Sequence, residues 1–204
     1  MIKALCLATA CLSVFGAAAK AGTLEVTVLD AGGQPVHDAV VSVRMAGNAG
    51  GPARFTQAPQ MAQKDIQFAP GILLVPVGAN VSFPNFDRVR HHVYSFSKTK
   101  KFELKLYGHD QSRSVRFDQA GTVVVGCNIH DQMRGFIRVV DTPFAGISDA
   151  RGRVVLANLP AGAARIVVWH QANRARDGEV MSTMSLPSTG KATQVTRLTL
   201  IPGR

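Results

Sequence analysis

Apolar and polar residues follow one another in short runs that are separated by turn residues. Such runs occupy residues 24–29 and 39–43, and others follow at 93–96, 102–107 and 122–125. Short runs rich in Val, alternating or continuous and bounded by Gly, Pro, Asn and Asp, are typical of β-strands. No segment shows the apolar period of an amphipathic helix of useful length. The pattern therefore predicts an all-β protein.

The strand-like runs form two groups. One group lies at the ends of the chain, in residues 24–45 with a turn at Asp30 to Gly33, and in residues 148–170. The other lies between them. Insertion of one domain into another is tolerated where the host's chain ends lie close together. We predict that the central segment is inserted into a β-sandwich built from both ends. The alternative is a tandem order, with an N-terminal hairpin packed on the central domain.

This organisation sets the expected boundaries. We assign residues 22–46 to the first half of the outer sandwich and 142–204 to its second half. A linker rich in Gly, Ala and Pro occupies 47–60, and the central domain occupies 61–141. The apolar run at 72–77 contains Pro76, which is typical of an edge or bulged strand.

Residues 1–21 have the composition of a secretory signal peptide. Lys3 precedes an apolar segment at 4–18, and Ala19-Lys20-Ala21 provides a small-residue cleavage site. The apolar stretch before Cys11 is too short for the alternative, a lipoprotein signal. No apolar run reaches the roughly 18–20 residues of a membrane span. We expect a periplasmic protein that is not an integral membrane protein.

Signal cleavage would remove Cys6 and Cys11 and leave Cys127 as the only thiol. Exported proteins meet an oxidising compartment, in which cysteines normally occur in pairs. Metal ligation best explains an unpaired cysteine there.

The formal net charge is +10, and cleavage would lower it by two. Such a charge favours acidic partners or an anionic membrane surface and steers their encounter. The arginines are scattered and no aromatic stacking platform lies among them, so we expect no nucleic-acid binding.

The candidate chemistry is concentrated between Cys127 and Met133, in a C-x2-H-x2-M pattern. The flanking apolar runs predict a strand, a tight loop and a returning strand. Sulfur donors with imidazole select copper, and two His and one Cys with a weak axial Met form electron-transfer copper sites. One short loop cannot surround a metal evenly. His91, in the pair His91-His92, is the obvious further supplier.

Each of these residues alone has a more ordinary interpretation. A lone Cys is usually a small buried hydrophobe, a lone Met fills a core, and a His-His pair lies on the surface. Their joint occurrence at this spacing makes a metal site the better interpretation.

Two stretches resemble the cupredoxin (plastocyanin-like) family: Gly78 to Asp87 with His91-His92-Val93, and Gly121 to Met133 with Gly135. The loop spacing is most similar to that of the amicyanins. The chain also resembles periplasmic proteins often labelled methylamine-utilisation proteins. The resemblance covers residues 61–141 and implies a Greek-key β-sandwich with one copper per chain.

The resemblance also implies the ligands: His91, Cys127 and His130, with Met133 as the axial ligand. His92 stands where the family usually has Asn, which leaves His92 as an alternative ligand. Asp131 stands where amicyanins have Pro, which predicts a less stiff loop with a more acidic surface. In the family, the downstream histidine, here His130, is the usual electron port. We expect the backbone around His91 and Asn85 to supply hydrogen bonds that tune the sulfur.

The outer segments resemble a carboxypeptidase-regulatory-like (transthyretin-like) β-sandwich, which is a non-catalytic accessory domain. Multicopper oxidases and copper nitrite reductases need a second, His-rich copper centre. Only His37, His109 and His170 lie outside the motifs, and no His-x-His pair occurs. We therefore expect that the protein is not an enzyme.

The motifs and the resemblance predict a periplasmic, mononuclear type 1 (blue) copper protein that carries electrons between redox partner proteins, acidic ones among them. The alternative is a copper carrier or storage protein that delivers copper in the periplasm. A third hypothesis is a wall or matrix interaction module in which copper is secondary. The oligomeric state stays open.

Overall fold

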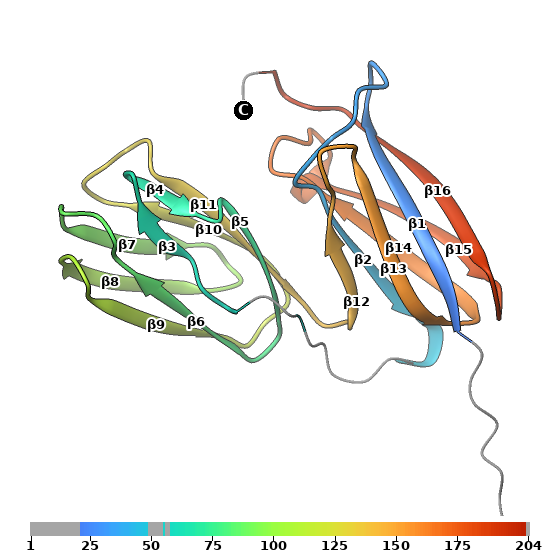
Figure 1. Ribbon diagram of the computed structural model, residues 1–204, viewed down its shortest axis with the longest axis horizontal. Coiled ribbons are helices and arrows are strands. Elements are labelled where there is room, and N and C mark those ends of the chain that lie inside the picture. The colour runs from blue at the N-terminus through green and yellow to red at the C-terminus, as the bar shows by residue number, and fades with distance from the viewer. Residues whose placement is uncertain (1–20, 49–54, 56–57, 203–204) are drawn as a thin grey trace, which may run out of the picture.

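The fold is built from strands, as a computed structural model of residues 21–48, 55 and 58–202 shows (Figure 1). This part of the chain contains 16 strands, two short 3-10 helices and no α-helix, so the predicted all-β class is confirmed. Within it, no helix is long and apolar enough to cross a membrane. The predicted signal peptide, except Ala21, and most of the predicted linker lie outside the described residues.

The central domain holds nine strands in three sheets. A five-stranded sheet has the order β5-β11-β10-β7-β8, and the pairs β3-β4 and β6-β9 form two small sheets. The strands are β3 (Ala62–Lys64), β4 (Gln67–Ala69), β5 (Ile72–Pro76), β6 (Ala79–Pro84), β7 (His91–Phe96), β8 (Lys101–Tyr107), β9 (Ser112–Phe117), β10 (Gly121–Cys127) and β11 (Arg134–Val140). Strand β5 lies at an edge of its sheet, where Pro76 is tolerated.

Side-chain alternation on β7 and β10 directs two candidate ligands into the central core. His91, Val93 and Ser95 are buried on one face of β7, and Val123, Val125 and Cys127 are buried on one face of β10. Successive side chains of a strand point to opposite faces. His91 and Cys127 therefore lie on the inward face of the same sheet, at the end where the core approaches the β10–β11 loop.

The outer sandwich joins strands from both ends of the described chain. Its sheets have the orders β13-β1-β16 and β12-β2-β14-β15. The strands are β1 (Ala21–Asp30), β2 (Val40–Met45), β12 (Phe144–Ile147), β13 (Arg153–Pro160), β14 (Gly162–Trp169), β15 (Glu179–Leu186) and β16 (Lys191–Leu198). Strands β1 and β2 do not pair with each other but enter different sheets. Residues from both ends share one apolar core, and the central domain connects β2 to β12. The residue boundaries assigned above stay predictions.

The two bodies share an apolar contact. Ile72, Phe136 and Trp169 belong to one buried cluster, and the rings of Phe136 and Trp169 lie 5.7 Å apart. Arg138 of β11 lies over the Trp169 ring and pairs with Glu179 at 3.0 Å. This contact covers the β5–β11 half of the outer face of the five-stranded sheet.

Candidate metal centre

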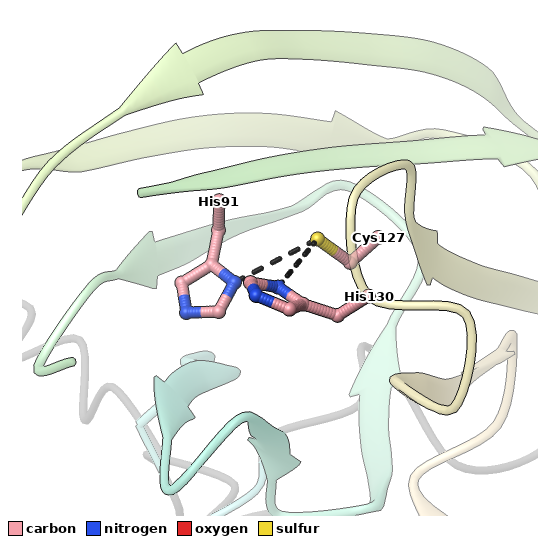
Figure 2. Close-up of side chains that lie close together, drawn as sticks. All are labelled: His91, Cys127 and His130. Carbon is pink, nitrogen blue, oxygen red and sulfur yellow. Dashed lines mark hydrogen bonds between the residues drawn. The ribbon is translucent and has the colours of Figure 1, made fainter. Parts of the chain in front are cut away.

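Three donor atoms from two segments meet at one end of the central core (Figure 2). Sγ of Cys127, at the end of β10, lies 3.6 Å from Nδ1 of His91, at the start of β7. It lies at the same distance from Nδ1 of His130. The two imidazole rings are 4.9 Å apart. His91 and Cys127 are 36 residues apart in the sequence. They come together because β7 pairs with β10, where Cys127 lies opposite Val93.

Backbone hydrogen bonds shape the loop that holds His130. The N–H of Met133 donates to the carbonyl of His130 at 2.9 Å, and the N–H of Cys127 donates to the carbonyl of Met133 at 3.3 Å. Asn128 donates its N–H to the carbonyl of His92 at 3.0 Å. These bonds turn the chain tightly, so that His130 returns toward the thiol three residues before it.

The donor spacing fits a metal. Bonds of about 2.3 Å to a thiolate and about 2.0 Å to an imidazole nitrogen, at a trigonal angle, separate the donors by roughly 3.7 Å. The observed separations of 3.6 Å agree with this value. A thiolate and two imidazoles form the donor set that suits copper. Among the described residues, His91, Cys127 and His130 are the group of potential ligands that meets such spacing.

Met133 and His130 differ in their exposure. Met133 is 2% exposed and belongs to the same apolar core as Cys127. His130 is partly exposed, and its neighbours Ile129 and Asp131 are exposed. The candidate centre therefore lies just below the surface, with His130 as the donor nearest to solvent.

The adjacent histidines point to opposite faces of β7. His91 is fully buried beside Cys127. His92 lies on the outer face, where its Nε2 is 2.8 Å from a carboxylate oxygen of Glu103 on β8. The structure thus brings His91, and not His92, to the other two donors.

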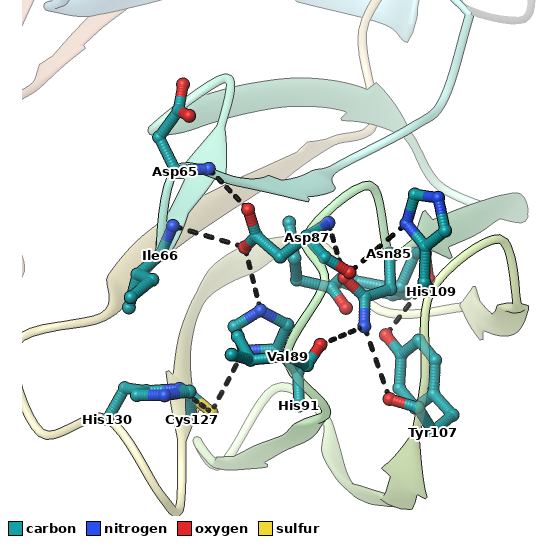
Figure 3. Close-up of polar contacts among 12 residues, drawn as sticks. Asp65, Ile66, Asn85, Asp87, Val89, His91, Tyr107, His109, Cys127 and His130 are labelled. Carbon is teal, nitrogen blue, oxygen red and sulfur yellow. Dashed lines mark hydrogen bonds and ion pairs between the residues drawn. The ribbon is translucent and has the colours of Figure 1, made fainter.

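The carboxylate of Asp87 is the partner of His91 that the sequence analysis missed (Figure 3). Nε2 of His91 donates to Oδ2 of Asp87 at 2.8 Å, which leaves Nδ1 to face Cys127. A bond of this kind fixes the tautomer of a ligating histidine and raises its basicity. Burial raises the pKa of Asp87, but hydrogen bonds from His91, Ile66 and Asp65 outweigh it and hold the pKa below its usual value.

A two-residue turn between β3 and β4 holds Asp87 in place. Asp65 and Ile66 both have φ of 55°, the left-handed conformation that a type I′ hairpin turn requires. This conformation is rare for a β-branched residue such as Ile66. Both N–H groups donate to Asp87, from Asp65 at 2.6 Å and from Ile66 at 3.1 Å. The charged acceptor stabilises the turn, and the turn fixes the carboxylate beside His91.

Asn85 secures the loop between β6 and β7. Its side chain is fully buried, donates to the carbonyls of Val89 and Tyr107, and accepts the N–H of Asp87. The side-chain bonds of Asn85 brace the backbone that carries Asp87 and His91. The expected hydrogen bonds from the backbone around His91 and Asn85 to the sulfur stay a prediction.

Comparison with known proteins gives structural neighbours only. No family model and no curated protein matches the chain. A Cu-containing nitrite reductase from Thermus scotoductus SA-01 shares 25% identity over 44% of this chain, with a TM-score of 0.39. This chain spans 25% of that chain's length. A purple cupredoxin from Nitrosopumilus maritimus shares 22% identity, covering 40% of this chain and 98% of its own, with a TM-score of 0.36. An amicyanin from Paracoccus versutus shares 18% identity, covering 48% and 97%, with a TM-score of 0.38.

Proposed function

We propose that the chain is a mononuclear type 1 copper protein that carries electrons in the periplasm. One observation carries the proposal: one thiol sulfur lies 3.6 Å from each of two imidazole nitrogens, in a largely buried setting. His91, Cys127 and His130 would hold the copper, and the thioether of Met133, buried in the same core, would be a weaker fourth donor. Bound copper would supply a one-electron couple.

The protein's own residues support this function by holding the donors in place. Copper binding requires a deprotonated Cys127 and neutral imidazoles with a lone pair toward the metal. Asp87 holds the proton of His91 on Nε2, which satisfies this requirement at Nδ1. Cys127 is only 3% exposed, which limits the access of bulk water to the sulfur. A site fixed before the metal binds rearranges little when the oxidation state changes.

The wider setting of the chain is also proposed. Residues 1–21 would direct export, and the outer sandwich would be a carboxypeptidase-regulatory-like accessory domain of a methylamine-utilisation-type protein. The shared core of β1, β2 and the C-terminal strands supports a sandwich with an inserted copper domain. We assign the chain no catalytic step.

The experiment is copper loading of the purified, secreted chain. Metal analysis should give one copper per chain, and oxidation should give an intense thiolate-to-Cu(II) absorption in the visible range. Cys127→Ser should abolish the colour, because a hydroxyl does not replace the soft thiolate. Met61→Leu, in the same core, is the control and should stay coloured. A coloured Cys127→Ser variant would exclude Cys127 as the ligand.

Copper delivery is the second candidate function. The partial exposure of His130 favours it, because a partner could reach this donor and take the metal. The two functions make different demands on Met133: an electron carrier needs its sulfur to tune the reduction potential, and a delivery protein needs it to hold Cu(I).

A further inference from the structure

The outer face of the five-stranded sheet is covered on one half only. Ile72 of β5 and Phe136 of β11 pack on the outer sandwich at Trp169. The β7–β8 half continues from this contact, and its outward side chains Phe96, Lys101 and Glu103 are exposed. Val124 of β10 marks the border, because it packs against the buried cluster and also lines a hollow beside Tyr94 and Phe96 on the open half.

Two aromatic side chains stand on the open half. The rings of Tyr94 and Phe96 on β7 lie 5.1 Å apart. Phe96 is 80% exposed, more than any other large apolar side chain in the described residues. Hollows of about 420 and about 240 Å³ lie on either side of this pair. We call Tyr94 and Phe96 the aromatic ridge. Its exposure is unfavourable in water, and a partner that covers it would gain apolar burial.

The aromatic ridge also touches the strand that bears the thiol. A Cβ atom at Gly126 would lie 3.1 Å from Cζ and from the hydroxyl oxygen of Tyr94. The ring of Tyr94 thus packs directly on the backbone of Gly126, the residue before Cys127. A partner bound at the aromatic ridge would therefore touch a side chain that packs on the strand bearing Cys127. It would not need to bind the loop that holds His130.

Lysines surround the exposed end of the aromatic ridge. Lys101 of β8 lies directly opposite Phe96, and Lys98 and Lys100 lie in the turn between these strands. Lys105 follows on β8 and is exposed. The nearby acid Glu103 is paired with His92 at 2.8 Å. This positive charge disfavours a second copy of the chain, because the same lysines would meet, and favours an acidic surface.

We infer that the aromatic ridge and its lysines form the docking site for an acidic protein partner with an apolar side chain at its centre. The inference rests on the proposed function, because it names the class of the redox partner. The hollows beside the ridge can receive side chains of a folded partner. A flat anionic membrane would not fill them.

The test is an NMR titration of the 15N-labelled chain, both copper-free and in the Cu(I) form. The probe is a synthetic peptide of Asp and Glu residues around one Leu. The matched probe replaces the acids by Asn and Gln. The acidic peptide should shift amide signals on β7, β8 and β10, and the neutral peptide should shift them much less. Phe96→Ser and Lys101→Glu should each weaken binding about tenfold.

Arg197→Glu is the matched control, because it makes the same charge change at an exposed site on β16 of the outer sandwich. It should leave peptide binding unchanged. Shifts confined to the loop around Ile129 and His130, or no shifts, would overturn the inference. So would stronger, Phe96-dependent binding to phosphatidylglycerol vesicles. Since the titration also uses the copper-free chain, a failure to bind copper would refute the proposed function without deciding the docking result.

Discussion

Oδ2 of Asp87 lies 2.8 Å from Nε2 of His91, on the side of the imidazole that faces away from Cys127. The carboxylate receives two further hydrogen bonds, from the backbone of Asp65 and Ile66. Asp87 therefore joins the β3–β4 turn to the candidate metal centre. It fixes the direction in which His91 presents its free lone pair.

Replacement of Asp87 by Asn should raise the reduction potential of the copper protein. A carboxylate makes the imidazole a stronger donor, which stabilises Cu(II) over Cu(I), and a neutral amide does so less. A neutral amide is also a weaker acceptor for the N–H groups of the β3–β4 turn. The free energy of unfolding of the copper-free chain should therefore fall by about 1–3 kcal/mol. Voltammetry and denaturant unfolding measure the two effects. Asp110→Asn, an exposed site, is the control. An unchanged reduction potential in Asp87→Asn would show that the carboxylate of Asp87 does not tune His91 as a ligand.

The adjacent histidines give a paired prediction. His91→Gln should bleach the visible absorption, because it removes a buried donor 3.6 Å from Cys127. His92→Asn should keep the colour, because His92 contacts Glu103 on the opposite face of β7. Both variants are measured by copper content and visible spectrum. The reverse result would make His92 the ligand.

Much of this centre could be predicted from local sequence. The C-x2-H-x2-M spacing between two apolar runs predicted the loop between β10 and β11, and period-two alternation predicted the strands. These features depend on neighbouring residues, so a single sequence shows them. The pattern also placed His91 and His92 on opposite faces, which the structure bears out.

The roles of Asp87 and Tyr94 could not be predicted in the same way. Asp87 matters because a turn 21 or 22 residues earlier presents two N–H groups to it. That turn holds Ile66 at positive φ, which no propensity rule suggests. Tyr94 matters because its ring covers Gly126 on the neighbouring strand, a relationship set by strand register. Likewise, nothing local indicated that β1 and β2 enter different sheets.

Acid should destabilise the outer sandwich through His170. This side chain is 7% exposed, and its Nδ1 accepts the N–H of Ala172 at 3.2 Å. Burial lowers the pKa of His170, repulsion from His37 lowers it further, and Asp38 opposes both. As the pH falls, the imidazole of His170 therefore takes up a proton at a higher pH in the unfolded chain than in the folded chain. Stability therefore falls as the pH drops through the ordinary value of 6.5.

The His170→Asn variant tests this effect, because Asn keeps an acceptor for the N–H of Ala172 but does not titrate. Between about pH 7.5 and about pH 5, the Tm of the wild type should fall by roughly 2–4 °C more than that of the variant. All other titrating groups are common to both proteins and cancel in the difference. A parallel fall in both would show that His170 takes up its proton without cost to the fold.

The Met133→Leu variant separates electron transfer from copper delivery. Leu keeps the volume and apolar character of this buried position but removes the soft sulfur. In an electron carrier the site should stay coloured and reversible, and its potential should rise because a thioether donates charge to Cu(II). In a delivery protein the sulfur would chiefly hold Cu(I), so Cu(I) affinity should collapse. Voltammetry and competition with a Cu(I) chelator measure both, with Met61→Leu, buried in the same core, as the control. If Met133→Leu leaves the reduction potential unchanged but greatly lowers the Cu(I) affinity, copper delivery is the better assignment and electron transfer is rejected.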